Sequence, residues 1–360
     1  MDNIDYTHFI VPAELDNSDA SMKMGNESFI TKDLVFLDSK KDLKDIGNEE
    51  KVASCTDYAI VNSATQYKNG ITKAGKKGTS CYWLRSAHSE NEADRVNVDG
   101  SDTSFKNYRF VDETYLGIRP VMHLDIRKIA YAQKRLTGFG KITPVKDNKG
   151  NVIYYTIEFG EYPKTKAKNS NQLEDLFEEH RLYATGKKYL GRSKNDNSDF
   201  VENKEFEYRG KKYVRVQTFS HEAGNWYADG SKISDIGCTW IKVEPITWII
   251  RNWDELPKSI NPNGNGKATY IDVVAEEIIM GGIPFYPYQN GENISLWQNS
   301  TIRGYLNGID VRNIKKNGNI THTAPDGGNF SKHSFLSEAF RPDLERKLMQ
   351  EDDDNFEMVV

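Results

Sequence analysis

The chain has 360 residues, of which 37% are hydrophobic and 11% aromatic, enough for one large domain or for two to three ordinary ones. Its formal net charge is −5, and Lys and Arg are mixed with Asp and Glu, which argues against nucleic acid as a partner. The three cysteines are widely spaced, which argues against a disulfide framework and against a four-cysteine zinc site. We see no signal peptide and no apolar run near the ~20 residues of a membrane helix, so we expect a cytoplasmic protein without a membrane partner. Release by a route that needs no signal peptide stays an alternative.

The first third of the chain is predicted to hold short strands and a small helix. The apolar run at residues 34–37 predicts a strand, and Asp38 and Ser39 can cap a helix over residues 40–46. A Gly- and Lys-rich loop at residues 70–78 then leads to the next strand.

Two short motifs bracket the segment that follows, Y-W-L-R-S at residues 82–86 and G-I-R-P at residues 117–120. Between them, residues 95–98 alternate polar and apolar side chains and lead into Asp99-Gly100, a pattern typical of a half-buried strand that ends in a tight turn. Residues 118–124 alternate in the same way. We therefore predict three or four short antiparallel strands here.

The remainder of the chain is predicted to be rich in strands. Turn signals mark residues 126–150 as a bridge, residues 151–159 have the strongest β propensity, and residues 172–182 predict a short acidic helix. Between residues 205 and 250 we predict strands, with a hairpin turn at Arg209-Gly210, another turn at Asp229-Gly230, and Pro245 at an edge or bulge.

Two helical segments are predicted near the end. Apolar residues at helical spacing predict a helix over residues 297–307 that stops at Asn307-Gly308, and residues 335–340 predict a last helical turn. The acidic tail at residues 351–360 is expected to fray.

Taken together, these motifs resemble a bacterial family known as domain of unknown function 6273. The segments that resemble its first half are residues 159–163, 244–248, 297–307 and 335–340. Those that resemble its second half are residues 33–37, 56–59, 82–86 and 117–120. Tyr82 stands where the family has Trp, and Ile118 stands where it usually has Val.

The resemblance implies an α+β, C-type-lectin-like fold, shared with formylglycine-generating enzymes, with short antiparallel strands and two or more helices. The halves occur in reversed order, so residues 1–125 supply the second half, residues 126–150 a bridge, and residues 151–350 the first half with a β-rich insertion at about 164–240. Circular permutation, domain swapping and two separate incomplete domains all fit this order. We favour permutation, because each half alone would expose a sheet edge and half a core.

Permutation makes two geometric predictions. The strand at residues 151–159 is expected to pair antiparallel with the strand at residues 118–124, because a short bridge connects them. The segments 33–37 and 297–307 are expected to pack in one core within one chain.

Catalytic and metal sites find little support in the sequence. By fold analogy an enzyme would use a copper-binding cysteine pair, but Cys55, Cys81 and Cys238 match no such motif and are expected to be buried thiols without a disulfide. Glu158, Glu161 and Glu244 stand near strand ends and are expected to be solvated or ion-paired. The oxygens of residues 97–102 alternate as in a calcium loop, but a hairpin turn explains them more simply. We expect no metal and no cofactor.

The polar segment between the two bracketing motifs is the candidate binding surface, since Asn, Ser, Asp and Tyr on a rigid frame are typical of binding loops. In C-type-lectin-like proteins this region commonly carries ligand contacts, as the resemblance implies. The candidate ligand-binding residues are His88, Asn91, Asn97, Asp99, Asp102, Asn107, Tyr108 and Tyr115. The residues predicted to be structural are Trp83, Arg85, Arg119, Trp248, Trp297 and Arg303. Arg85 and Arg119 are expected to be buried and hydrogen-bonded to the backbone or to a carboxylate, and a role as ligand clamps is the alternative.

We therefore expect a non-enzymatic recognition module for a protein or glycan. The alternatives are an oxidoreductase like the formylglycine-generating enzymes and a structural subunit of a phage or cell-surface assembly. The last would form stable homo-oligomers.

Overall fold

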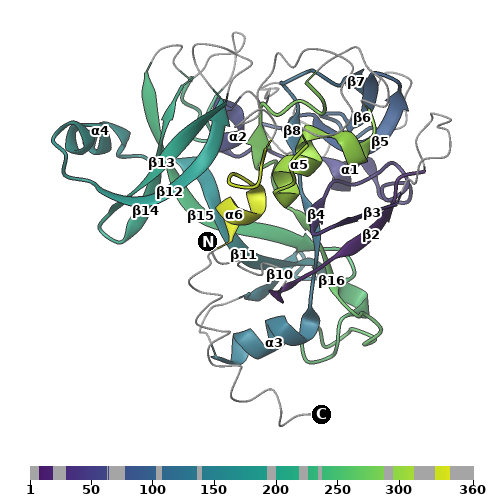
Figure 1. The fold of residues 1–360 in the computed structure, drawn as a ribbon. Helices are drawn as coiled ribbons and strands as arrows, with labels where there is room; N and C mark the ends of the chain where they lie inside the picture. Colours follow the sequence, from purple (N-terminus) through teal and green to yellow (C-terminus); the bar gives the residue numbers. More distant parts are fainter. Residues whose placement is uncertain are drawn as a thin grey trace.

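The computed structural model describes residues 8–18, 30–62, 64, 78–102, 108–135, 140–192, 200–218, 226–233, 237–287, 295–311 and 329–340. Within these ranges the protein is mostly β-sheet with a few short helices, an α+β mixture as predicted (Figure 1). The helices are α1 (Asn48–Lys51), α2 (Asp57–Val61), α3 (Ile126–Arg135), α4 (Ser170–Glu178), α5 (Thr301–Asn307) and α6 (Phe335–Ala339), with 3₁₀ turns η2 (Trp253–Glu255) and η3 (Trp297–Asn299).

A ten-stranded sheet forms the centre of the molecule. Its strands are β1 (Ile10–Val11), β4 (Val35–Phe36), β9 (Val121–Leu124), β10 (Ile142–Lys146), β11 (Val152–Lys166), β12 (Tyr183–Arg192), β13 (Phe200–Tyr208), β14 (Lys211–Gln217), β15 (Cys238–Ile250) and β16 (Ile271–Ala275). The long strand β15 organises this sheet, because it pairs with β11 along one edge and with β14 and then β16 along the other. All of these pairings are antiparallel.

A smaller five-stranded sheet lies beside the large one and has the strand order β17–β8–β5–β6–β7. Its strands are β5 (Tyr82–Ser89), β6 (Glu92–Val96), β7 (Tyr108–Phe110), β8 (Gly117–Ile118) and β17 (Met280–Gly281). A third, two-stranded sheet consists of β2 (Ala13–Asp16) and β3 (Ile30–Asp33). The Y-W-L-R-S and G-I-R-P motifs therefore supply two neighbouring strands, β5 and β8, which pair in parallel.

Several local predictions are confirmed. Arg209 and Gly210 connect β13 to β14 with φ angles of 52° and 70°, as a two-residue hairpin turn with the twist of its strands requires. Pro245 lies opposite Glu161, next to a register shift in β11, so it occupies the expected bulge. Helix α5 ends at Gly308, whose φ of 68° is left-handed.

The predicted pairing of residues 151–159 with residues 118–124 is wrong. Strand β11 pairs with β15 and with the hairpin partner β10, while β9 pairs with β16 on one side and with β1 and β4 on the other. The reason is that the predicted bridge carries α3 and β10, and β10 folds back at a turn over residues 147–150 to take the edge of β11. Strands β15 and β16 therefore separate β11 from β9 within one sheet.

The helix predicted over residues 40–46 is replaced by consecutive turns. Ser39 and Asp42 bond each other reciprocally, with Asp42 N donating to Ser39 Oγ at 3.1 Å and Ser39 N donating to Asp42 Oδ2 at 2.8 Å. The capping geometry that the sequence predicted is thus present, but the helix does not continue beyond it.

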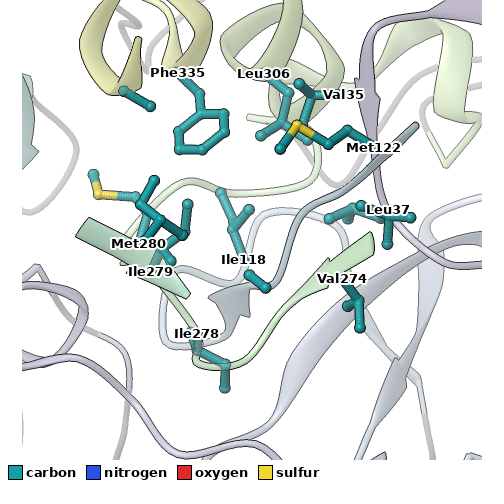
Figure 2. Close-up of a cluster of buried hydrophobic side chains, with 14 of the residues drawn as sticks. Val35, Leu37, Ile118, Met122, Val274, Ile278, Ile279, Met280, Leu306 and Phe335 are labelled. Carbon is teal, nitrogen blue, oxygen red and sulfur yellow. The ribbon is translucent and has the colours of Figure 1, made fainter. Parts of the chain in front are cut away.

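Segments 33–37 and 297–307 contribute to one hydrophobic core, as predicted. Figure 2 shows Val35 and Ile118, from the first third of the chain, packed among Ile278, Met280 and Leu306 from the last third. All five side chains are completely buried. Segments 33–37 and 297–307 therefore share one hydrophobic core within this chain.

Hydrogen bonds reinforce this junction. The side chain of Asn307 accepts bonds from Leu34 N at 2.9 Å and Val35 N at 3.0 Å and donates to Val35 O at 2.7 Å. The buried carboxylate of Asp33 accepts from Trp297 Nε1 at 2.8 Å and from Arg303 Nε at 2.7 Å. Strands β3 and β4 are in this way fastened to η3 and α5, more than 250 residues away in the sequence.

A lobe formed by β12, β13, β14 and α4 lies to the left in Figure 1. It has its own small cluster of buried side chains, Ala167, Leu173, Phe206, Tyr213 and Trp240. Glu174 of α4 accepts hydrogen bonds from Arg215 of β14 and from Trp240 Nε1 of β15, the latter at 2.8 Å. The helix is thereby held against the sheet in the region where the sequence predicted a β-rich insertion.

Candidate functional site

The two motif arginines are buried, as predicted, and each is 4% exposed. Arg85 Nη1 donates to Leu37 O at 2.9 Å, its Nε donates to Asn17 Oδ1 at 2.9 Å, and the guanidinium also contacts the carboxylate of Asp42. These partners join β5 to the segments that precede it in the chain. The guanidinium is therefore occupied by the protein itself, which favours the structural role over that of a ligand clamp.

Arg119 connects the small sheet to the large one. Its Nε donates to Ala275 O at 2.8 Å, and its Nη1 lies 3.2 Å from both Lys51 O and Tyr82 Oη. The guanidinium also lies 5.5 Å from the centre of the Tyr82 ring. Arg119 thus ties β16 and α1 to β5, and its donors point into the protein.

The remaining residues predicted to be structural also support the frame. Trp83, Trp248 and Trp297 are at most 1% exposed. Trp248 Nε1 donates to Phe159 O at 2.7 Å. Arg303 is half-buried and forms the ion pair with Asp33 described above.

The small sheet presents a polar and aromatic face formed by β5, β6 and β7. Asp94 and Tyr108 are direct register partners, and His88 lies against both of them. His88 Nδ1 is 3.1 Å from Asp94 Oδ1, and the rings of His88 and Tyr108 stack with centroids 4.0 Å apart and planes 12° apart. The imidazole is therefore held in one orientation by a carboxylate and an aromatic ring.

Lys40 completes this arrangement. Its Nζ lies 2.9 Å from Asp94 Oδ1, and its backbone N donates to Ser86 Oγ at 2.9 Å. Asp94 is only 2% exposed beneath these neighbours. Burial raises the pKa of Asp94, while Lys40 and His88 act in the opposite direction.

An exposed aromatic side chain lies beside this polar cluster. Phe110 shares its side of β7 with Tyr108, since the two are separated by one residue in a strand, and it is 42% exposed. Strand β7 is the last strand of its sheet. We call Lys40, His88, Asp94, Tyr108 and Phe110 together the β7 face.

The structure thus brings together only part of the predicted binding set. His88 and Tyr108 belong to the β7 face, and Asn91 lies next to it in the turn between β5 and β6, where its carbonyl accepts from Val111 N. Asn97 and Asp99 lie in the turn at the other end of β6, and Asp99 accepts a bond from Ser101 N at 3.0 Å.

Two of the predicted binding residues, Tyr115 and Asp102, do not belong to the β7 face. Tyr115 accepts a hydrogen bond from Arg109, whose side chain lies on the opposite side of β7 from Tyr108. Asp102 is 1% exposed and forms a buried ion pair with Lys51, at 2.8 Å, so its prediction as a ligand contact is corrected to a structural role. Asn107 lies outside the described residues.

The sequence reasoning missed three members of the β7 face, namely Lys40, Asp94 and Phe110. Phe110 and Asp94 stand two residues from other polar or aromatic members of their strands, so strand alternation could have found them. Lys40 comes from a distant segment, and nothing in its local sequence indicates that it meets Asp94.

A small hollow lies at the bulge where β11 meets β15. It is lined by Thr56, Tyr162, Pro163, Lys164, Glu244, Pro245, Ile246, Thr247, Glu277 and Ile279. An ion pair of 2.7 Å between Lys164 and Glu277 crosses it, and Glu244 contacts Thr165 and Lys242. The hollow is partly open to solvent and has room for about one water molecule.

The three cysteines are free thiols. Cys55 and Cys81 are buried, and burial raises the pKa of both. A reactive or metal-binding cysteine needs a lowered thiol pKa, so both thiols are poor nucleophiles as placed. Among the residues that the structure describes, no group of three or more His, Cys, Asp or Glu side chains is arranged to hold a metal ion.

Comparison with known proteins gives one family. Residues 5–126 match the model of a family described as domain of unknown function (DUF6273). The match covers about a third of the chain and includes all of β5, β6 and β7, so the β7 face lies entirely within it. No curated protein and no solved structure matches the chain. In the described part of the chain we find no helix long and apolar enough to cross a membrane.

Proposed function

We propose that this chain is a non-enzymatic recognition module that binds a protein through the β7 face. The observation that carries the proposal is Phe110, an exposed aromatic side chain on a terminal strand, directly beside an ordered His88–Tyr108 stack. Protein interfaces obtain most of their binding energy from a few aromatic anchors surrounded by polar groups, and this surface has that composition.

The polar neighbours support the same function. Lys40, His88 and Asp94 are already held by one another, so little side-chain freedom is lost when a partner covers them. Preorganised surfaces bind more tightly for this reason. The β7 face offers a lysine–carboxylate ion pair, an imidazole and an apolar ring across the neighbouring strands β5, β6 and β7, which suits a complementary protein surface better than a single sugar ring.

As part of this proposal we assign the chain a C-type-lectin-like fold with its two halves in permuted order. The motif resemblance supports the assignment, and so does the shared core of segments 33–37 and 297–307. The family match at residues 5–126 covers the segment that resembles the second half.

The competing enzymatic proposal, an oxidoreductase like the formylglycine-generating enzymes, is disfavoured by the buried, high-pKa thiols of Cys55 and Cys81. The ligand panels described below would reveal a glycan ligand. Light scattering would reveal the stable homo-oligomers of an assembly subunit.

The experiment compares three forms of the protein on two ligand panels, a displayed random-peptide library and a glycan array. The forms are the wild type, Phe110→Asp on the β7 face, and Tyr183→Asp as a matched control on β12, where the tyrosine is 71% exposed. We expect the wild type and the control to enrich the same peptides, and Phe110→Asp to lose them. Binding to glycans but not to peptides, or equal enrichment by Phe110→Asp, would overturn the proposal.

A further inference from the structure

A buried acid joins four elements in the centre of the molecule. Glu338 of α6 is 2% exposed. Its Oε1 accepts from Leu190 N of β12 at 2.8 Å, and its Oε2 lies 2.8 Å from Tyr305 Oη of α5 and 3.1 Å from Tyr162 Oη of β11. The two tyrosine oxygens are themselves 2.6 Å apart. Three oxygen atoms therefore form a closed triangle.

The number of hydrogens in this triangle depends on the state of Glu338. Three contacts of hydrogen-bond length need three hydrogens, and the hydroxyls of Tyr162 and Tyr305 supply two. If Glu338 is ionised, one pair of oxygens faces each other without a hydrogen between them. If Glu338 is protonated, each of the three groups donates once and accepts once, and every contact is satisfied.

Burial, rather than the neighbouring groups, opposes a charge on Glu338. Tyr58 of α2 and Tyr189 of β12 face it, but Tyr58 donates to a backbone carbonyl of β12 and Tyr189 donates to Glu205. The hydrogen bonds from Tyr305, Leu190 and Tyr162 and the charge of Lys187 of β12 act to lower the pKa of Glu338, but burial outweighs them. Burial raises the pKa of Glu338 from 4.5 to about 7.

We infer that Glu338 is a proton-dependent clasp, which in its protonated form holds α6, α5, β11 and β12 together and which loosens when the proton is lost. Strand β12 is the outer strand of the lobe that α4 covers, and the Leu190 amide is its direct bond to Glu338. Loss of the proton is therefore expected to weaken the contact between β12 and α6, where the Leu190 amide bonds to Glu338.

The sign of the pH effect follows from the two states of the chain. The unfolded chain releases this proton near the ordinary value of 4.5, whereas the folded protein keeps it up to about pH 7. Because the folded state binds more protons over that window, its stability falls as the pH rises from about 4.5 to about 7 and stays low above it.

The test uses Glu338→Gln in the full chain. The glutamine oxygen can still accept from Leu190 N, and its amide hydrogens can still reach the tyrosine oxygens, but it carries no titratable proton. We expect hydrogen-exchange protection of the Leu190 amide, corrected for the intrinsic rate, to fall about tenfold in the wild type between about pH 6 and about pH 8, and to stay constant in the variant.

An infrared difference spectrum keeps the inference testable if the variant folds poorly. In the wild type near neutral pH we expect the absorption of a buried protonated carboxyl that disappears as the pH is raised, and that is retained in a Glu205→Gln control. An identical pH response of Leu190 protection in wild type and Glu338→Gln, or a wild-type spectrum without a protonated carboxyl, would overturn the inference.

Discussion

Replacing Arg119 by Ala removes a buried guanidinium that connects the two larger sheets. The side chain is 4% exposed and donates to Ala275 O, Lys51 O and Tyr82 Oη at 2.8, 3.2 and 3.2 Å. The substitution thus leaves a cavity next to β16 and takes a donor from three acceptors at once.

The magnitude follows from these contacts. The Lys51 carbonyl keeps the Tyr82 hydroxyl as a donor at 2.8 Å, so its loss is partial, whereas the Ala275 carbonyl loses its guanidinium donor. A buried acceptor without its donor costs about 1–3 kcal/mol, and the cavity and the weakened contacts of Lys51 O and Tyr82 Oη add to this cost. Because the guanidinium no longer has to be desolvated, part of the sum is offset, and we expect Arg119→Ala to lower the free energy of unfolding by roughly 2–4 kcal/mol.

Urea denaturation, followed by fluorescence of the buried tryptophans, measures this change as a lower midpoint with an unchanged slope. Arg127→Ala in α3 is the matched control, because its side chain is 93% exposed, and we expect it to alter the free energy of unfolding by less than about 0.5 kcal/mol. Arg119→Lys keeps the charge but not the forked donor geometry, and should fall between the two. If Arg119→Ala were as stable as Arg127→Ala, the structural role of the guanidinium would be refuted.

Two further predictions concern the cysteines and the joined segments. Thiol counting on denatured protein should find Cys55, Cys81 and Cys238 all free, and the purified protein should bind no stoichiometric copper and should not oxidise cysteine peptides; a missing pair of thiols or bound copper would restore the enzymatic interpretation. Residues 1–140 expressed alone should not unfold cooperatively, because β9 would lose β16, and Asp33 would lose Trp297 and Arg303; a soluble, cooperatively folded fragment would contradict the shared core.

Features governed by neighbouring residues could be predicted from the sequence. The turn at Arg209-Gly210 needs positive φ at both positions, Pro245 cannot donate to a ladder, and Gly308 suits a helix end, so each is decided within a few residues. The burial of Arg85 and Arg119 was also predicted, as arginines that hydrogen-bond to the backbone or to a carboxylate and fix the sheet.

Features that depend on distant segments could not be predicted in the same way. Strand β16 pairs with β15 and β9, but no feature of its local sequence indicates these partners. Strand β10 was not predicted, because Pro144 and the flanking turns hide the pattern of a short edge strand. The burial of Asp102 depends on Lys51, and the burial of Asp94 depends on Lys40. In each case an ion pair formed by a remote lysine decides whether a carboxylate faces the solvent.

The most direct test of the proposed function is a titration of the best peptide or protein ligand from the panel against wild type, Phe110→Asp and Tyr183→Asp. Loss of an aromatic anchor at the centre of an interface typically costs 2 kcal/mol or more, so we expect the Kd for Phe110→Asp to rise by at least about thirtyfold. The Kd for Tyr183→Asp should match that of the wild type, and both variants should keep the wild-type thermal midpoint. Equal affinities for all three proteins would contradict recognition through the β7 face.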